Sequence, residues 1–174
     1  MLGLKKLGLV KSAFIGTLLL GASFNSLATT SEDYEKVLRA YNVSEYDEAY
    51  IHLKNSLQKD PENLAAKILM GRILLINGYL VAAEQEFTEA LSMGADINLL
   101  AEPLGNTWLF LNKYKDITEF NHTEKLSGEN KRDWLQITAT ACVRLEDLFC
   151  AKSEYSKILN DYPTHVPAMN GLAS

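Results

Sequence analysis

Proline and glycine are scarce in this chain, which has 4 prolines and 10 glycines among 174 residues. Because all-β folds need frequent turns rich in these two residues, their scarcity argues against a sandwich or barrel and permits long helices. Hydrophobic residues make up 47% of the chain and charged residues 22%. These fractions are typical of folded proteins, so the composition does not predict disorder.

The motifs of common catalytic sites are also missing. The sequence has neither a glycine-rich phosphate loop nor the strand-turn-helix motif that exposes a nucleophilic serine. The three histidines, His52, His122 and His165, lie far apart and have no cysteine or acidic residue at the spacing of a metal site. We therefore expect no catalytic residue, no metal and no cofactor, and the sequence predicts a protein that is not an enzyme.

Acidic residues are absent from the first 28 positions, which carry Lys5, Lys6 and Lys11, an apolar run over 12–24 and small residues up to Ala28. This order is typical of a secretory signal peptide over 1–28 with cleavage after Ala28. The apolar run is shorter than the ~20 residues that a membrane-spanning helix needs, and an uncleaved N-terminal anchor is the alternative. No cysteine follows that could carry a lipid. We expect a periplasmic or secreted protein.

Cleavage at that point also makes the protein strongly negative. It removes three of the 17 basic residues and none of the 22 acidic ones, which leaves a formal charge of −8. A negative protein is a poor ligand for nucleic acid or for an anionic membrane surface. We therefore expect no nucleic-acid partner, and membrane contact at most through an uncleaved signal anchor.

The rest of the chain is repetitive, with a period of about 34 residues. Small residues recur at this interval, with one exception, at Ala49, Ala83, Ile117 and Ala151. Four residues further on, large apolar residues recur with one exception at Leu53, Phe87, Asn121 and Tyr155. A second small site falls at Val37, Gly71, Gly105 and Ala139. Small residues at a fixed site let two helices approach closely, and large residues at the next turn fill the space between them.

Each repeat unit contains two apolar patterns of helical length, separated by a short turn such as Asn77-Gly78. Pro61, Gly94 and Pro163 end the units, because none of them readily continues a helix. The pattern predicts a repeat domain over 29–165, with units near 30–63, 64–97, 98–131 and 132–165, followed over 166–174 by the start of a fifth helix pair or a C-terminal tail.

Several segments resemble the tetratricopeptide repeat, whose period is the same. They are Tyr-Asp-Glu-Ala at 46–49, Lys-Asp-Pro-Glu-Asn at 59–63, and Met70-Gly71 followed by Leu74, Ala83, Phe87 and Ala90. The resemblance covers about residues 30–165. It implies an all-α fold, a right-handed solenoid of about four antiparallel helix pairs, and a role in holding another protein.

Two places depart from the regular pattern. In the third unit Ile117, Asn121 and Glu124 replace the small-large-small set, so we expect its second helix to be short, rotated, or followed by an irregular segment over 121–130. Pro103 lies a turn inside the first helix of the same unit, where proline is poorly tolerated. We therefore expect this helix to start late, near Glu102, or to be kinked there.

The fifth unit stops soon after it begins at Val166. A repeat array needs a polar-faced end, so we expect the chain to be part of a longer array. A short capping helix is the alternative, because terminal repeats are often atypical.

Cys142 and Cys150 are the only cysteines, and they fall on either side of the turn within the fourth unit. An oxidising compartment permits a disulfide between them. Two separately packed thiols are the alternative, since free cysteine is commonly buried.

Stacks of this kind usually bind their partners on the concave surface that the first helices line. By register this surface includes Tyr34, Leu38, Tyr41, Ile68, Arg72, Leu75, Ile76, Glu102, Asn106, Leu109, Phe110, Gln136, Thr140 and Arg144. Its mixture of apolar and polar groups suits a peptide or a partner helix, with Arg72 and the aromatic residues as anchors. For Leu75 and Leu109 the alternative is packing between units. The lysine and asparagine clamp of some tetratricopeptide co-chaperones is not expected, because Ile68, Arg72 and Glu102 occupy those sites.

Residues 53–63, running into 69–72, are similar to the large repeat lipoprotein of bacterial PEP-CTERM/exosortase systems. The similarity implies a Gram-negative envelope scaffold linked to protein sorting and exopolysaccharide export. That family is longer and is usually lipidated on a cysteine, whereas Ser23 stands near the corresponding place here. The alternatives are an assembly factor for pili or outer-membrane proteins, and a non-catalytic repeat segment of a larger enzyme.

Overall fold

The computed structural model describes residues 34–173, so the signal peptide expected over 1–28 lies outside the described part. Within residues 34–173 every regular element is helical. After a helix over 34–42 the order is α2 (Tyr46–Lys59), α3 (Leu64–Ile76), α4 (Leu80–Ser92), α5 (Ile97–Phe110), α6 (Tyr114–Thr118), the 3₁₀ turn η1 (Thr123–Lys125), α7 (Gly128–Arg144), α8 (Leu148–Asp161) and α9 (Val166–Ala173).

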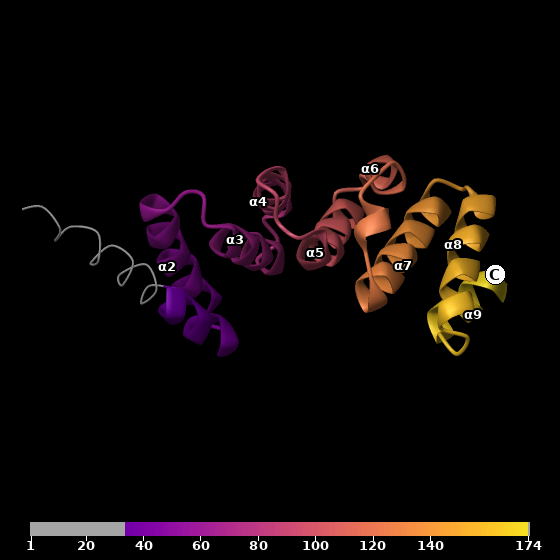
Figure 1. Cartoon of the computed structure of the whole chain (residues 1–174), viewed down its shortest axis with the longest axis horizontal. Helices are drawn as coiled ribbons and strands as arrows, with labels where there is room; N and C mark the ends of the chain where they lie inside the picture. The colour runs from indigo at the N-terminus through magenta and orange to yellow at the C-terminus, as the bar shows by residue number, and fades with distance from the viewer. Residues whose placement is uncertain (1–33, 174) are drawn as a thin grey trace, which may run out of the picture.

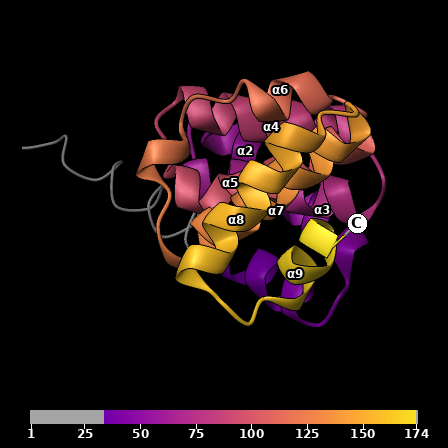
Figure 2. The same ribbon diagram turned by 90° about the vertical axis from the view of Figure 1, so that its right-hand side faces the viewer.

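Consecutive helices form antiparallel pairs that stack into an elongated array (Figure 1). Within pairs, α3 packs on α4 and α7 on α8, and between pairs α4 packs on α5 and α5 on α7. Figure 2 looks along the array, with α8 and α9 nearest the viewer. The predicted all-α solenoid of helix pairs is therefore confirmed. No helix among residues 34–173 is long and apolar enough to cross a membrane.

The turns inside the four pairs share one backbone geometry. Ser44, Gly78, Asn112 and Glu146 all have positive φ, between 58° and 79°, and each stands one repeat period after the last. The N–H of each following residue donates to the carbonyl five residues before it, as from Tyr79 to Leu74 at 2.8 Å and from Lys113 to Trp108 at 2.8 Å. This arrangement satisfies carbonyls at the helix end that have no partner within the helix. The period of the sequence is thus present in the backbone as well as in the side chains.

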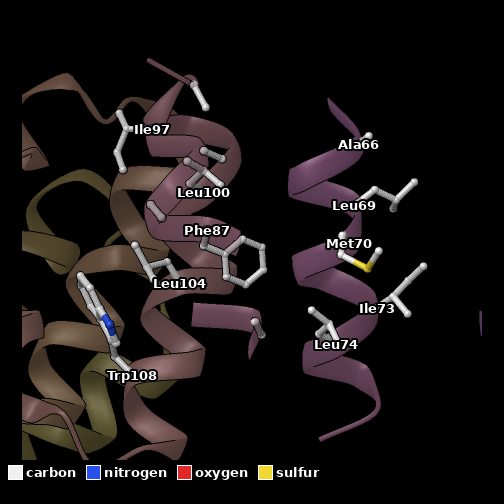
Figure 3. Close-up of a cluster of buried hydrophobic side chains, with 14 of the residues drawn as sticks. Ala66, Leu69, Met70, Ile73, Leu74, Phe87, Ile97, Leu100, Leu104 and Trp108 are labelled. Atoms are coloured by element: carbon white, nitrogen blue, oxygen red, sulfur yellow. The ribbon is translucent and has the colours of Figure 1, made fainter. Parts of the chain in front are cut away.

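Glycines at equivalent places in α3 and α5 let the helices approach closely. A Cβ atom on Gly71 would lie 2.5 Å from the ring of Phe87, and one on Gly105 would lie 2.9 Å from Trp134. Phe87 is fully buried and points from α4 toward α3, beside Leu100 and Leu104 of α5 (Figure 3). The small-large pattern of the sequence therefore corresponds to direct contact in the core.

The third pair is irregular, as expected. Its second helix, α6, has only 5 residues, of which Ile117 is buried, and an irregular segment containing η1 follows it. A cluster of aromatic rings packs beside it: Phe120 lies 5.5 Å from Trp108 and 4.8 Å from Trp134 between ring centroids. These rings supply the apolar volume that a full-length second helix would otherwise provide.

The expectation that the first helix of this pair starts late was wrong. The helix α5 begins at Ile97, where Asp96 caps it by accepting a hydrogen bond from the Asn98 backbone N–H at 2.9 Å, and Pro103 lies inside it. Hydrogen bonds from the backbone and side chain of Asn98 also lower the pKa of Asp96. Pro103 has no N–H to donate to the carbonyl of Leu99. Arg72 of α3 supplies the missing donor, with Nη2 3.1 Å from that carbonyl oxygen.

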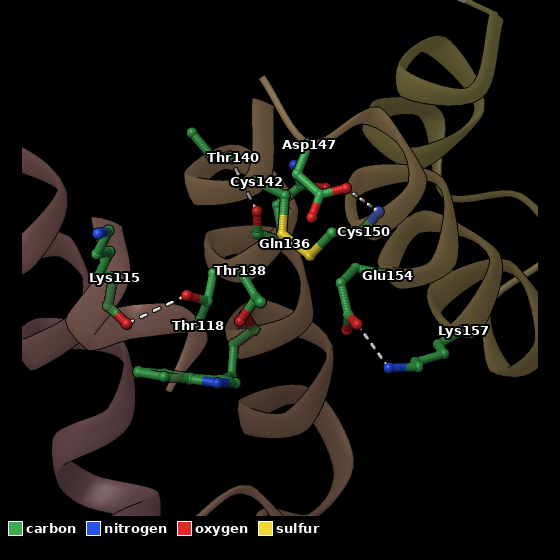
Figure 4. The surroundings of a disulfide bond; sticks show 11 residues. Lys115, Thr118, Gln136, Thr138, Thr140, Cys142, Asp147, Cys150, Glu154 and Lys157 are labelled. Carbon is green, nitrogen blue, oxygen red and sulfur yellow. Dashed lines mark hydrogen bonds and ion pairs between the residues drawn. A yellow bond between two sulfur atoms is a disulfide. The ribbon is translucent and has the colours of Figure 1, made fainter. Parts of the chain in front are cut away.

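A disulfide joins Cys142 to Cys150, at the end of α7 and the start of α8 (Figure 4). Their Cα atoms are 5.7 Å apart, within the range of about 4.4–6.8 Å that disulfides adopt. Asp147 caps α8 between them by accepting a hydrogen bond from the Cys150 N–H at 2.9 Å. The bond therefore ties the two helices of the fourth pair together beside their turn.

Candidate binding surface

The first groove lies between the helix over 34–42, α3 and the start of α5, and we call it the inner groove. It encloses about 390 Å³ and is lined by Tyr34, Leu38, Tyr41, Asn42, Ala65, Ile68, Leu69, Arg72 and Leu99. Five of the predicted binding residues therefore meet in one place, from two neighbouring pairs. Ala65, the smallest side chain in the lining, is exposed within the groove.

The walls of the inner groove are mainly apolar and open to solvent. Leu38 is 38% exposed and Leu99 is 53% exposed, whereas Tyr34 and Ile68 are half-buried against the core. Burial raises the pKa of Tyr34 further above the physiological range. Its neutral hydroxyl can donate a hydrogen bond. This surface suits an apolar side chain with a polar group beside it.

Arg72 is already engaged by the neighbouring helix. Besides donating to the Leu99 carbonyl, its guanidinium lies 4.0 Å from Glu102, whose carboxylate accepts a hydrogen bond from Asn106 at 2.8 Å. The Arg72 side chain remains 36% exposed. It therefore holds α3 to α5 and keeps a free edge along the groove.

We expect Arg72→Met to lower the free energy of unfolding by about 1 kcal/mol, the usual net value of one hydrogen bond. In a Pro103→Ala background the same change should cost close to nothing, because the alanine N–H can donate to the Leu99 carbonyl. Urea denaturation followed by circular dichroism measures both values. Arg39→Met, on an exposed arginine of the first helix, is the control. An equal cost of Arg72→Met in both backgrounds contradicts this role.

The remaining predicted residues do not line the inner groove. Ile76 and Phe110 are exposed at the ends of α3 and α5, while Leu75 and Leu109 are half-buried against the core, which agrees with the packing alternative. On α7, the Thr140 hydroxyl donates to the carbonyl of Gln136 at 2.9 Å in its own helix. Gln136, Thr140 and Arg144 thus form a separate polar stretch on the fourth pair.

Four residues of the groove were not predicted from the sequence, namely Asn42, Ala65, Leu69 and Leu99. Ala65 and Leu99 are one repeat period apart. They occupy the second position of their units, so the repeat register could have predicted that both residues lie on the same face of the array. Asn42 ends the first helix, beside the turn at Ser44, where register alone does not show which way a side chain faces.

The histidines have local contacts that suit a structural role. His52 lies 3.5 Å from Glu48, His122 packs on Phe120 with ring centroids 5.1 Å apart, and His165 accepts a hydrogen bond from the N–H of Ala168 in α9. In the described part of the chain no three His, Cys, Asp or Glu side chains are placed to hold a metal ion.

No protein-family model matches the sequence, and no curated protein sequence matches it. Solved structures do match the fold. A tetratricopeptide repeat protein from Parabacteroides merdae is 23% identical, with a TM-score of 0.73 over 83% of this chain and 57% of that one. YrrB, described as a tetratricopeptide protein with an unusual peptide-binding site, is 18% identical, with a TM-score of 0.69 over 84% of this chain and 79% of that one.

PilW, described as a widely conserved type IV pilus biogenesis factor, is 16% identical, with a TM-score of 0.65 over 80% of this chain and 65% of that one. This chain spans 57% of the Parabacteroides structure. At these identities the similarity establishes the arrangement of the helices. The chain therefore has the fold of the tetratricopeptide repeat proteins.

Proposed function

We propose that the protein is an exported, non-catalytic adaptor that binds an apolar segment of a partner protein in the inner groove. The observation that carries the proposal is the open apolar wall formed by Leu38, Ile68 and Leu99, with two tyrosines beside it. Contiguous exposed apolar surface is typical of sites that bind another protein. The peptide-binding site named for YrrB, which shares the fold, supports this mode of binding.

Export is the second element of the proposal. The signal-peptide pattern over 1–28 supports it, and so does the disulfide between Cys142 and Cys150, because disulfides persist mainly in oxidising compartments. N-terminal sequencing of the periplasmic fraction is expected to begin at Thr29. A chain that keeps Met1 and sediments with membranes would support the uncleaved anchor instead.

The cellular setting that we propose is PEP-CTERM/exosortase sorting and exopolysaccharide export, on the basis of the resemblance of residues 53–63 and 69–72. Pilus assembly is the second candidate, because PilW shares the fold. The two settings differ in the identity of the partner. A crosslinked sorting substrate supports the first, and a crosslinked pilus or outer-membrane component supports the second.

Photocrosslinking tests the groove directly. A photoreactive residue in place of Ala65, which is exposed within the inner groove, is expected to capture a defined partner in the envelope of the source cell. Leu38→Arg should lower the yield at least about tenfold, since it places an unpaired charge against the bound apolar segment. Ile51→Arg, on α2 at 58% exposure and outside the groove, is the matched control. The photoreactive chain is compared with the same chain carrying Leu38→Arg or Ile51→Arg. Equal yields from these three proteins would exclude the inner groove as the binding site.

A further inference from the structure

A second groove lies on the opposite side of α3, and we call it the outer groove. It consists of two adjoining cavities of about 400 and 360 Å³, which share Tyr50, Leu74 and Ala82. The other lining residues are Asp47, Asn77 and Tyr79 in one cavity and Lys54, Leu57, Gln58, Met70 and Glu86 in the other. None of these residues lines the inner groove.

The floor of the outer groove is apolar and its rim is aromatic. Met70 and Leu74 are nearly buried, at 5% and 8% exposure, and they project from the face of α3 opposite to Ile68 and Arg72. Tyr50 is 37% exposed and Tyr79 is 64% exposed. In Figure 1, α2 and α4 lie on either side of α3, and they supply the two walls. Tyrosine walls over an apolar floor are common at protein-binding sites, because a rigid ring offers a large contact area at little cost in entropy.

At one end of the outer groove, Glu86 shares its nearest cation with a second carboxylate. The buried Lys67 lies 3.1 Å from Glu89 and 3.9 Å from Glu86, so a single ammonium group serves two carboxylates. It is closer to Glu89, and Oε2 of Glu86 is buried without a hydrogen-bond partner. Burial raises the pKa of Glu86, Lys67 partly opposes this, and Glu89 adds to it. Lys67 therefore balances the negative charge of Glu86 only in part. The Glu86 side chain is 24% exposed and lines the groove.

We propose that the outer groove binds an extended segment of a partner protein that places an aliphatic or aromatic side chain over Met70 and Leu74 and a lysine or arginine at Glu86. The apolar floor accounts for the first requirement and the under-compensated carboxylate for the second. Of the other charged residues along the groove, Asp47 lines the first cavity, and Lys54 lines the second cavity together with Glu86. The assignment is independent of the inner groove, and a protein that uses both grooves can bridge two partners.

Selection of phage-displayed dodecapeptides on the purified full-length chain, followed by fluorescence-anisotropy titration of the selected peptides, tests the assignment. The expected peptides carry lysine or arginine next to leucine, phenylalanine or tyrosine. Ala82→Trp fills the groove from an exposed position and should weaken their binding at least about tenfold, and Glu86→Gln should weaken it several-fold and reduce its salt dependence. Val81→Trp, on the adjacent residue at 70% exposure and outside both cavities, should change nothing.

Circular dichroism checks that each variant folds. If Ala82→Trp does not fold, Tyr79→Ala, at an exposed position on the rim, replaces it. Three results overturn the assignment. The first is a set of peptides without basic residues or with affinity insensitive to these variants. The second is loss of binding in Leu38→Arg alone, which places the peptides in the inner groove. The third is a concentration-dependent dimer that Ala82→Trp abolishes, which makes a second copy of the chain the occupant.

Discussion

Replacement of Trp134 by alanine is expected to lower the free energy of unfolding by about 3–5 kcal/mol, the usual cost of removing a fully buried large aromatic side chain. Trp134 is 2% exposed and lies 4.8 Å from Phe120 and 6.4 Å from Trp108 between ring centroids. Its ring also lies against Gly105 of α5, so it joins α7 to the third pair. The neighbouring α6 is only 5 residues long and offers few side chains that could fill the space.

Urea denaturation followed by circular dichroism measures this loss. Phe149→Ala is the matched control, because Phe149 is an aromatic residue of the adjacent α8 and is 87% exposed. Its removal should change the free energy of unfolding by less than about 0.5 kcal/mol. If Trp134→Ala costs less than about 1 kcal/mol, the aromatic cluster does not replace the missing part of the second helix.

The helix pairs could be predicted because the signals that build them are local or strictly periodic. Small and large residues that recur once per repeat mark the sites where helices touch, and the contact of Gly71 with Phe87 is one of them. The turns repeat the same period through four residues of positive φ, but only Gly78 among them is a glycine. Glu146 and Ser44 carry no strong local preference for that conformation, so the stacking of the pairs imposes it on them.

The start of α5 ahead of Pro103 could not be predicted from the sequence, because the contact that compensates for the proline is tertiary. The rule that proline ends a helix assumes that the freed carbonyl finds no other donor. Here Arg72, from the preceding pair, donates to it. Nothing in the local sequence around Pro103 shows that a guanidinium lies within reach.

The outer groove also could not be predicted from the repeat register of the sequence. The sequence pattern identifies which face of each second helix packs against the first helices, and this explains Ala83, Phe87 and Ala90. It does not show how far α2 stands from α4, and that spacing decides whether Met70 and Leu74 are covered or line a groove. The distance between units depends on the packing of whole helices.

Phe87→Ala is expected to lower the free energy of unfolding by about 3–5 kcal/mol, because it leaves a cavity at a fully buried site between α3 and α5. Gly71→Ala alone should cost about 1–3 kcal/mol, since the new Cβ atom would lie 2.5 Å from the Phe87 ring. In the double variant the added methyl group enters the cavity. The combined loss should therefore fall short of the sum of the single losses by at least about 1 kcal/mol.

Gly105→Ala provides the control for this double-mutant cycle. Gly105 occupies the same position one unit later, and its added Cβ atom would meet Trp134 and Ile137 at 2.9–3.0 Å. Phe87 is not among its nearest neighbours, so Gly105→Ala and Phe87→Ala should add within about 0.5 kcal/mol. If Gly71→Ala also adds to Phe87→Ala within that margin, the glycine is not needed for the approach of the ring. The periodic recurrence of small residues in the first helices would then require a different explanation, such as helix propensity or chain flexibility.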